Sequence, residues 1–169
     1  MDVTIAPDGS IWFGCFSVSW GGGGLVRYQP DTDTWTSWGY DPEPDGWPGV
    51  RPTIEAVVAQ PKPGGGYLVW IECSFGDVQY DSDTQQFTEL PNVDAPGEIE
   101  VILANDACDD AGNVWMLRQT TPGQPYSLDY RQPDGTWVTP TPAFPQPVYD
   151  LSAIRAFGDG ECLLIGGDS

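Results

Sequence analysis

Residues 7–14 read PDGSIWFG, a turn followed by a short apolar segment that contains Trp12. The Asp-Gly pair favours a tight turn, and the residues after it have the composition of a buried strand. The meaning of this stretch depends on whether it occurs once or is one copy of a repeat. Related stretches elsewhere in the chain therefore decide the fold.

Two sets of similar segments recur along the chain. One set comprises IWFGC at 11–15, VWIEC at 69–73 and VWMLR at 114–118, with a weaker copy, CLLIG, at 162–166. The other comprises YQPDTDTW at 28–35, YDSDTQQF at 80–87 and YRQPDGTW at 130–137, in which two aromatic residues flank a polar turn. The first set is typical of buried strands and the second of hairpins. We expect Trp12, Trp70 and Trp115 to be buried at equivalent positions.

A third set consists of short apolar segments that end in alanine, at Ala6, Ala59, Ala104 and Ala156. The intervals between these alanines are 53, 45 and 52 residues, and each interval holds four short strand candidates. Four-stranded units of this length are typical of β-propeller blades. The innermost strands are expected at about 2–6, 54–59, 98–104 and 149–156, where they would line a central channel and place each alanine at a crowded point between blades.

The sequence therefore predicts an all-β fold, a β-propeller segment with four-stranded antiparallel blades. The expected blades are 2–40, 54–91 and 98–140, followed by a half blade at 149–166. About three and a half blades do not close a ring, because propellers typically have about 4 to 8. Three interpretations stay open: a fragment of a longer propeller, self-association of two or more copies, and a meander that is not a propeller.

The segment PDGSIWFGC together with GGGGLVRYQPDTDTW resembles the blade motif of the two-component-regulator and virginiamycin B lyase-like propellers. The resemblance is good over 3–38, looser over 54–91 and 98–139, and covers two strands after 149. It implies a propeller fold, which sensors, lyases and scaffolds share. The lyase branch implies a catalytic histidine, and this chain has no histidine. A lactonase-like metal set of Glu, Asn and Asp cannot be matched position by position either.

The charge of the chain excludes several classes of partner. There are 25 acidic and 6 basic residues, for a formal charge of −19. Binding to nucleic acid or anionic membrane requires basic patches that the chain lacks. No apolar run approaches the roughly 20 residues of a membrane span, so membrane insertion is not expected, and the N-terminus lacks a secretory signal pattern. The acidity favours an extracellular, cell-surface or high-salt protein.

The four cysteines do not indicate a zinc site, because CxxC spacing and histidine are both absent. Cys15 and Cys73 follow Trp12 and Trp70 at the same distance, so they are equivalent positions rather than an obvious pair. Buried free thiols are one interpretation, and disulfides are the other if the protein is secreted.

Acidic residues recur four positions before the alanines, at Asp2, Glu55 and Glu100, with Ser152 at the fourth place. On the innermost strands these carboxylates would converge at the channel mouth and could hold a cation such as Ca²⁺ or a basic ligand group. Arg155 could pair with one of them. The alternative is that they are ordinary solvated residues in an acidic chain. No other cofactor is expected.

Two kinds of loop complete the candidate sites. Trp20 stands beside four glycines and could contact a sugar or a peptide, or fold back on its own blade. The acidic turns PDTDT, DSDT and NDACDDAGN lack the ligand pattern of a calcium loop and are better explained by Asp and Asn side chains that cap turns. The turn PDGTW resembles the structural Asp-box hairpin of sialidase propellers.

The function expected from the sequence is a non-enzymatic module that binds protein or carbohydrate, as the scaffold of an extracellular or surface protein. The competing interpretation is part of a lyase or glycan-acting enzyme, with its active residues in further blades or at the acidic mouth. No nucleophile arrangement can be assembled without histidine, and no pair of carboxylates is singled out by its spacing.

Overall fold

The computed structural model describes residues 2–15, 24–39, 54–73, 77–89, 100–102, 108–119, 127–140, 153–156 and 162–165. These residues form β-strands, turns and one 3₁₀ helix, which confirms the all-β prediction. In the described part of the chain, no helix has the length and apolar character needed to cross a membrane.

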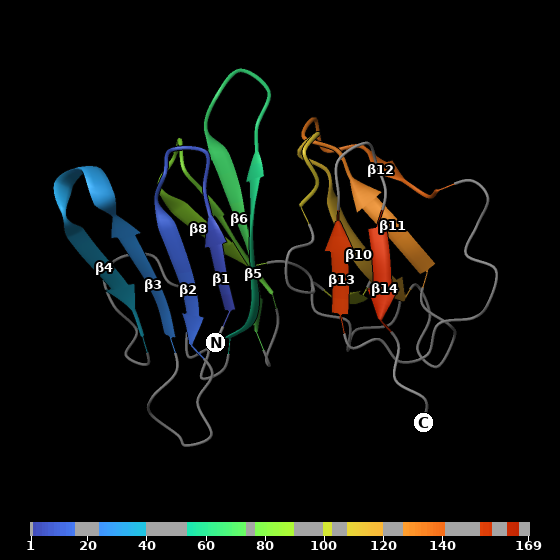
Figure 1. Ribbon diagram of the computed structural model, residues 1–169, viewed down its shortest axis with the longest axis horizontal. Coiled ribbons are helices and arrows are strands. Elements are labelled where there is room, and N and C mark those ends of the chain that lie inside the picture. The colour runs from blue at the N-terminus through green and yellow to red at the C-terminus, as the bar shows by residue number, and fades with distance from the viewer. Residues whose placement is uncertain are drawn as a thin grey trace.

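The strands form four antiparallel sheets in chain order (Figure 1). Sheet 1 contains β1 (Asp2–Ile5), β2 (Ile11–Cys15), β3 (Gly24–Gln29) and β4 (Thr34–Trp38), with η1 (Pro30–Thr32) between the last two. Sheet 2 contains β5 (Ile54–Pro61), β6 (Tyr67–Cys73), β7 (Val78–Asp81) and β8 (Gln86–Glu89). Sheet 3 contains β9 (Glu100–Ile102), β10 (Val114–Gln119), β11 (Ser127–Arg131) and β12 (Trp137–Val138), and sheet 4 contains β13 (Ala153–Ala156) and β14 (Cys162–Ile165).

Each sheet falls within one of the blade ranges expected from the sequence, 2–40, 54–91, 98–140 and 149–166. Within every sheet, each strand pairs with its neighbour in the chain, so no strand crosses over. Consecutive sheets contact one another, since β1 and β2 pack on β5, and β10 approaches β13. The arrangement is consistent with a propeller-like fragment, and the number of blades stays a prediction.

Similar five-residue turns close the first hairpin of sheets 1, 2 and 3. In sheet 1 the Ala6 N–H donates to the Ser10 carbonyl, and the Gly9 N–H donates to the Ala6 carbonyl. The same pair of hydrogen bonds joins Asp109, Gly112 and Asn113 in sheet 3. Gly9 and Gly112 both have a φ of 79°, a left-handed conformation that glycine adopts without the steric cost of a Cβ atom. The Gly in PDGS is thus required by the turn.

The main core lies between sheets 1 and 2 and is built around Trp12. Its ring stacks on Trp38 of the same sheet with centroids 5.5 Å apart, and it meets Tyr80 of sheet 2 at 4.8 Å and the edge of Tyr67 at 6.5 Å. Such aromatic pairs add to the energy of area burial. The burial of Trp12, Trp70 and Trp115 is confirmed, with exposed fractions of 0%, 4% and 3%.

At the first two sheet interfaces, an arginine lies over the buried tryptophan. The Arg27 guanidinium lies 5.4 Å from the Trp12 ring, and both residues belong to sheet 1. The Arg131 guanidinium of sheet 3 lies 4.9 Å from the Trp70 ring of sheet 2. Both interfaces therefore hold a cation–π contact. In the first, the arginine belongs to the same sheet as the tryptophan, and in the second it belongs to the facing sheet.

The third aromatic hairpin has a different register from the other two. Tyr28 pairs with Trp35 and Tyr80 with Phe87, as the sequence pattern suggested. In sheet 3, however, Trp137 pairs with Arg131, while Tyr130 pairs with Val138. The five-residue turn closed by Gln132 and Thr136 shifts the pairing by one residue, so the two aromatic residues fall on opposite faces.

The alanines are not in one phase, which corrects the sequence-based alignment. Trp12 pairs with Thr4, and Trp70 pairs with Val58, so the position equivalent to Ala6 is Gln60 rather than Ala59. Ala6 itself closes the turn of sheet 1, whereas the turn of sheet 2 lies two residues further from its tryptophan and is closed by Lys62. Ala59 is therefore offset by one residue from the position that matches Ala6. An odd shift moves a side chain to the other face of a strand. Ala6 and Ala59 consequently face one another in the core between the two sheets.

Candidate functional site

The candidate site is built on the edge of β5 that points away from β6. At this edge the Val57 N–H donates to Asp2 Oδ2 at 2.8 Å, and the Ala59 N–H donates to Thr4 Oγ1 at 3.2 Å. The next outward position is Pro61, which has no N–H. Unpaired edges invite strand addition, and proline is confined to such edges. Side chains of β1 and one proline therefore block strand addition at these three positions of β5.

A cavity of about 350 Å³ lies beside this edge. It is bounded by β1 and the turn after it, by β5, by Cys108 and by the end of β13, so sheets 1, 2 and 4 all contribute. The described lining residues are Thr4, Ile5, Ala6, Pro7, Val57, Val58, Ala59, Pro61, Cys108 and Ala156. Three of the four repeated alanines thus line one space, and Ala104 lies outside the described residues.

The described side chains that line this cavity are uncharged and mostly apolar. None of the described lining residues carries a charge, and the polar Thr4 hydroxyl already accepts a backbone hydrogen bond. The volume falls within the roughly 300–1,000 Å³ that is usual for small-molecule sites. The small alanine side chains leave the space open where the innermost strands approach one another. The arrangement can therefore hold a small uncharged group.

The cysteine in the wall is a poor nucleophile. Burial, followed by the nearby Asp109 and Asp110 carboxylates, raises the pKa of the Cys108 thiol to about 12. Its Sγ lies 3.6 Å from the Asp109 carbonyl oxygen, to which the S–H donates. The thiolate is the reactive form of cysteine, so this thiol is inert near neutral pH. Cys15, Cys73 and Cys108 are all free thiols.

The structure does not place Asp2 and Glu55 at equivalent positions. Asp2 is buried and binds the Val57 N–H. Glu55 is exposed, because the pairing of β5 with β6 is shifted between Ile54 and Ala56 and leaves Glu55 as the extra residue of a bulge. The position equivalent to Asp2 is Ala56, which corrects the alignment that suggested a ring of carboxylates.

The other predicted site residues are only partly described. Glu100 begins β9, and Arg155 pairs with Leu163 in sheet 4, but nothing is described of their side chains. Trp20 lies outside the described residues. Within the described ranges, no group of three His, Cys, Asp or Glu side chains could hold a metal ion. A cation site that includes Glu100 stays a prediction.

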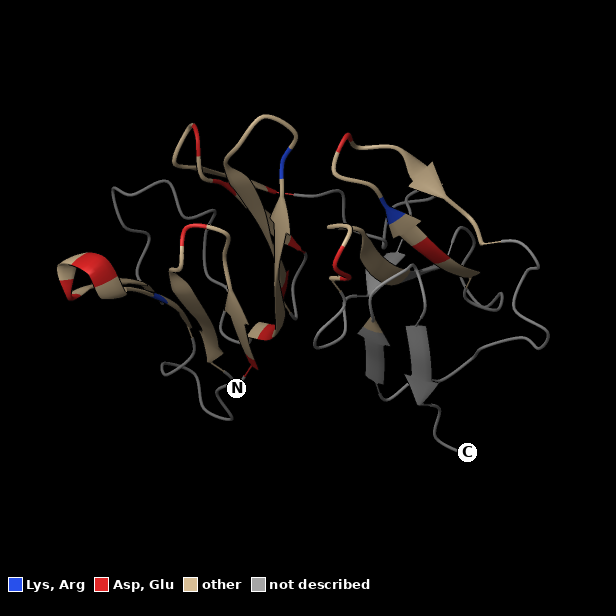
Figure 2. Cartoon of the chain, turned by 45° about the horizontal axis from the view of Figure 1, so that its top comes forward, with Lys and Arg blue, Asp and Glu red and all other residues tan. Residues whose placement is uncertain are grey.

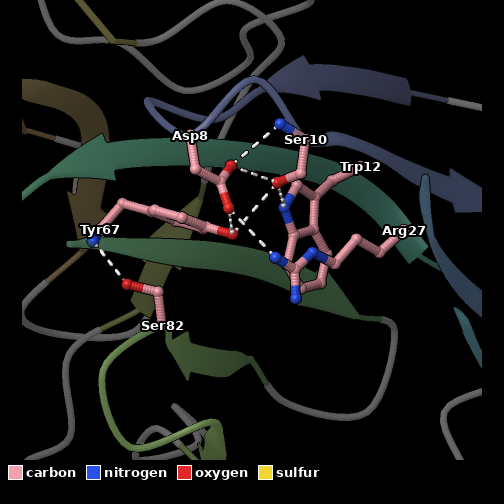
Figure 3. Close-up of polar contacts among 6 residues, drawn as sticks. All are labelled: Asp8, Ser10, Trp12, Arg27, Tyr67 and Ser82. Carbon is pink, nitrogen blue, oxygen red and sulfur yellow. Dashed lines mark hydrogen bonds and ion pairs between the residues drawn. The ribbon is translucent and has the colours of Figure 1, made fainter. Parts of the chain in front are cut away.

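A polar network joins the first turn of sheet 1 to sheet 2 (Figure 3). Asp8 Oδ1 accepts hydrogen bonds from the Ser10 N–H at 2.9 Å and the Ser10 hydroxyl at 2.6 Å. Asp8 Oδ2 accepts from the Tyr67 hydroxyl at 3.0 Å and pairs with Arg27 at 3.1 Å. The Trp12 N–H donates to Ser10 Oγ. Partial burial opposes ionisation, but the hydrogen bonds and Arg27 together keep the pKa of Asp8 below its usual value.

Other acidic turns also use their carboxylates to hold backbone groups. Asp109 Oδ1 accepts from the Ala111 and Asn113 N–H groups, and its Oδ2 accepts from the Trp115 indole. Asp134 accepts from the Thr136 N–H in the same way. In DSDT, Asp81 Oδ1 likewise accepts from the Asp83 N–H. The explanation of aspartates as turn-capping residues is therefore confirmed for the DSDT and NDACDDAGN turns. Their oxygens serve the fold, and Figure 2 shows how acidic residues gather at turns and strand ends.

Lys62, the single lysine of the chain, forms ion pairs with Asp81 and Asp83 and so joins the first turn of sheet 2 to its last hairpin. The hydrogen bond from Lys62 lowers the pKa of Asp81. Because these groups lie at the surface, where water screens their charges, the pairs contribute little to stability.

Gln60 is a structural residue that the sequence reasoning missed. It is fully buried, and its Nε2 donates to the carbonyls of Gly112 and Arg131 in sheet 3. Its Oε1 accepts from the Trp70 indole and from Arg131 Nη1. The available signal was a lone amide at the end of the apolar run IEAVVAQ. Thr4 was missed because a single threonine in a strand carries no distinguishing pattern.

The chain was compared with known families and proteins. No protein-family profile matches it, and no curated protein matches it either.

Among solved structures, the fold is similar to the extracellular domain of a putative hybrid two-component system from B. thetaiotaomicron. The TM-score is 0.51 at 21% sequence identity, and the match covers 97% of this chain and 20% of that chain. The chain thus spans about a fifth of the length of this neighbour. At this identity the similarity extends to the fold alone, and it agrees in part with the resemblance to two-component-regulator propellers.

Proposed function

We propose that the chain is a non-enzymatic binding module of an extracellular protein, and that it takes small apolar ligands in the cavity among β1, β5 and β13. The observation that carries this proposal is the cavity of about 350 Å³, whose described lining side chains are uncharged. The β5 edge beside it is not open to another strand, because the Val57 and Ala59 N–H groups are already bonded and Pro61 has no N–H. Small-molecule sites are commonly concave and largely preformed, and apolar side chains line most of them.

The polar side chains near the cavity and in the turns support a binding role rather than a catalytic one. Asp8 and Asp109 are engaged in turn and interface hydrogen bonds, and the Cys108 thiol has a pKa of about 12. None of these groups is poised as a base or nucleophile near neutral pH. The extracellular assignment is supported by the neighbouring structure, which is an extracellular domain, and by the strongly acidic composition.

The proposal is tested by calorimetric titration of the chain with indole, galactose and CaCl₂. Indole, a small and largely apolar molecule, is expected to bind. The Ala156→Phe variant is expected to remove binding, because the larger side chain fills the cavity from β13, where Ala156 is only half-buried. Circular dichroism would establish that the variant keeps its fold. Binding of galactose or Ca²⁺ without indole would contradict the proposal and favour a sugar or cation site.

A further inference from the structure

The face of sheet 1 that points away from sheet 2 carries an unusual apolar surface. We call it the outer face; its residues are Val3, Ile5, Ile11, Phe13, Val26, Tyr28 and Trp35, which follow from the strand pairing. Trp35 is 61% exposed, Ile5 69% and Val3 47%. Trp35 stacks on Tyr28 with centroids 4.4 Å apart and on Phe13 at 6.1 Å. Contiguous exposed apolar surfaces of this kind mark interaction sites.

The chain itself shows what such a face binds. With Trp12 aligned on Trp70, the positions of Ile11, Phe13, Val26, Tyr28 and Trp35 in sheet 1 correspond to Val69, Ile71, Val78, Tyr80 and Phe87 in sheet 2. In sheet 2 this face is covered by sheet 1, and Val69, Ile71 and Val78 are fully buried. The outer face of sheet 1 therefore has the residue types and register of a face that receives another sheet of the same kind.

We propose that the outer face of sheet 1 binds a second copy of this chain through the copy's sheet 4. Sheet 4 is the last of the four sheets in chain order and lies beside sheet 3, and its strand β14 has the wholly apolar sequence CLLI. Two such contacts related by a two-fold axis join two copies in a closed dimer. The two copies together bring eight sheets, within the range of about 4 to 8 blades that propellers use.

The charge distribution favours this occupant and predicts how the association responds to salt. None of the seven outer-face residues is charged, although the chain as a whole carries −19. Two equally acidic copies repel one another at long range and can approach closely only through an uncharged surface. Salt screens this repulsion without weakening apolar contact, so dimerisation strengthens as ionic strength rises. An electrostatically attracted partner would show the opposite dependence.

The test is sedimentation equilibrium of the chain over roughly 5 to 200 µM protein, in about 50 mM and about 1 M NaCl. The expected result is a mass that rises from 18.4 kDa toward twice that value, with tighter association at high salt. Trp35→Glu and Ile5→Asp are expected to weaken dimerisation by at least about tenfold, since both place a charge on the uncharged interface. Trp35→Phe should retain it.

Trp137→Glu is the matched control, because Trp137 is also an exposed tryptophan, 37% accessible, but lies on β12 of sheet 3. It should dimerise like the original chain. A monomer at every concentration in high salt would overturn the proposal. So would equal loss of dimer in Trp137→Glu and Trp35→Glu, or association that weakens as salt rises. Because Ile5 and Trp35 are both exposed, the two variants should keep the far-ultraviolet circular dichroism of the original chain.

Discussion

Replacing Gln60 by leucine should weaken the link between sheets 2 and 3. The substitution keeps the approximate volume of the side chain but removes an amide that makes four hydrogen bonds. The Trp70 N–H, the Gly112 carbonyl and the Arg131 carbonyl then lose this partner. Each buried polar group left unsatisfied costs about 1–3 kcal/mol. The Arg131 guanidinium is half-buried and can regain hydrogen bonds from water, so only the other three groups stay unsatisfied and we expect a total loss of about 3–9 kcal/mol.

The assay is urea unfolding followed both by tryptophan fluorescence and by circular dichroism. Gln60→Leu should lower the free energy of unfolding and separate the two transitions, because sheet 3 would no longer unfold together with sheet 2. Gln86→Leu is the matched control, because Gln86 is exposed on β8, and it should change stability by no more than about 0.5 kcal/mol. If Gln60→Leu is as stable as this control, the buried amide does not join the sheets and the reasoning is refuted.

Three further predictions concern the turns and the thiol. Asp8 has a lower pKa in the folded chain than in the unfolded chain, so its contribution to stability should be complete above about pH 5 and lost as the pH falls below about 4. Thermal unfolding at a series of pH values should show this loss, and Asp8→Asn should remove it. Iodoacetamide at pH 8 should modify Cys108 about 10³-fold more slowly in the folded chain than in urea, as followed by peptide mass spectrometry, and similar rates would contradict its raised pKa. Gly112→Ala should lower the free energy of unfolding, measured in urea, by about 3 kcal/mol, because the new Cβ would lie 2.6 Å from the Pro61 ring. Gly9 has the same φ but open space around it, so Gly9→Ala should lower the free energy of unfolding by about 1 kcal/mol.

The sequence allowed the strand pattern to be predicted because its signals are local. Trp12 and its turn PDGS are a few residues apart, and the same is true of Trp115 and its turn. The backbone N–H groups that the aspartates of these turns bind lie within four residues, so this role could be derived from turn chemistry. Local hydrogen bonds leave a local pattern, which a single sequence displays.

The candidate site could not be predicted in the same way, because it depends on register. The turn of sheet 2 lies two residues further from its tryptophan than that of sheet 1, and Ala59 is offset by one residue from the position that matches Ala6. This odd shift reverses the face expected for that alanine. A bulge at Glu55 separates that residue from the position equivalent to Asp2. Neither irregularity has a signature in residue types alone. The contact of Asp2 with Val57, 55 positions apart, is likewise invisible before the sheets are placed.

The most direct test of the central proposal, that residues of sheets 1, 2 and 4 line one ligand-binding cavity, is an alanine-methyl NMR titration with indole. The methyl resonances of Ala6, Ala59 and Ala156 should shift together with a single dissociation constant, because all three residues line the same space. The methyl of Ala111, which lies exposed in the turn before β10, should not respond. Indole-dependent shifts at Ala111 without shifts at the three lining alanines, or shifts of those three with unrelated dissociation constants, would contradict the account.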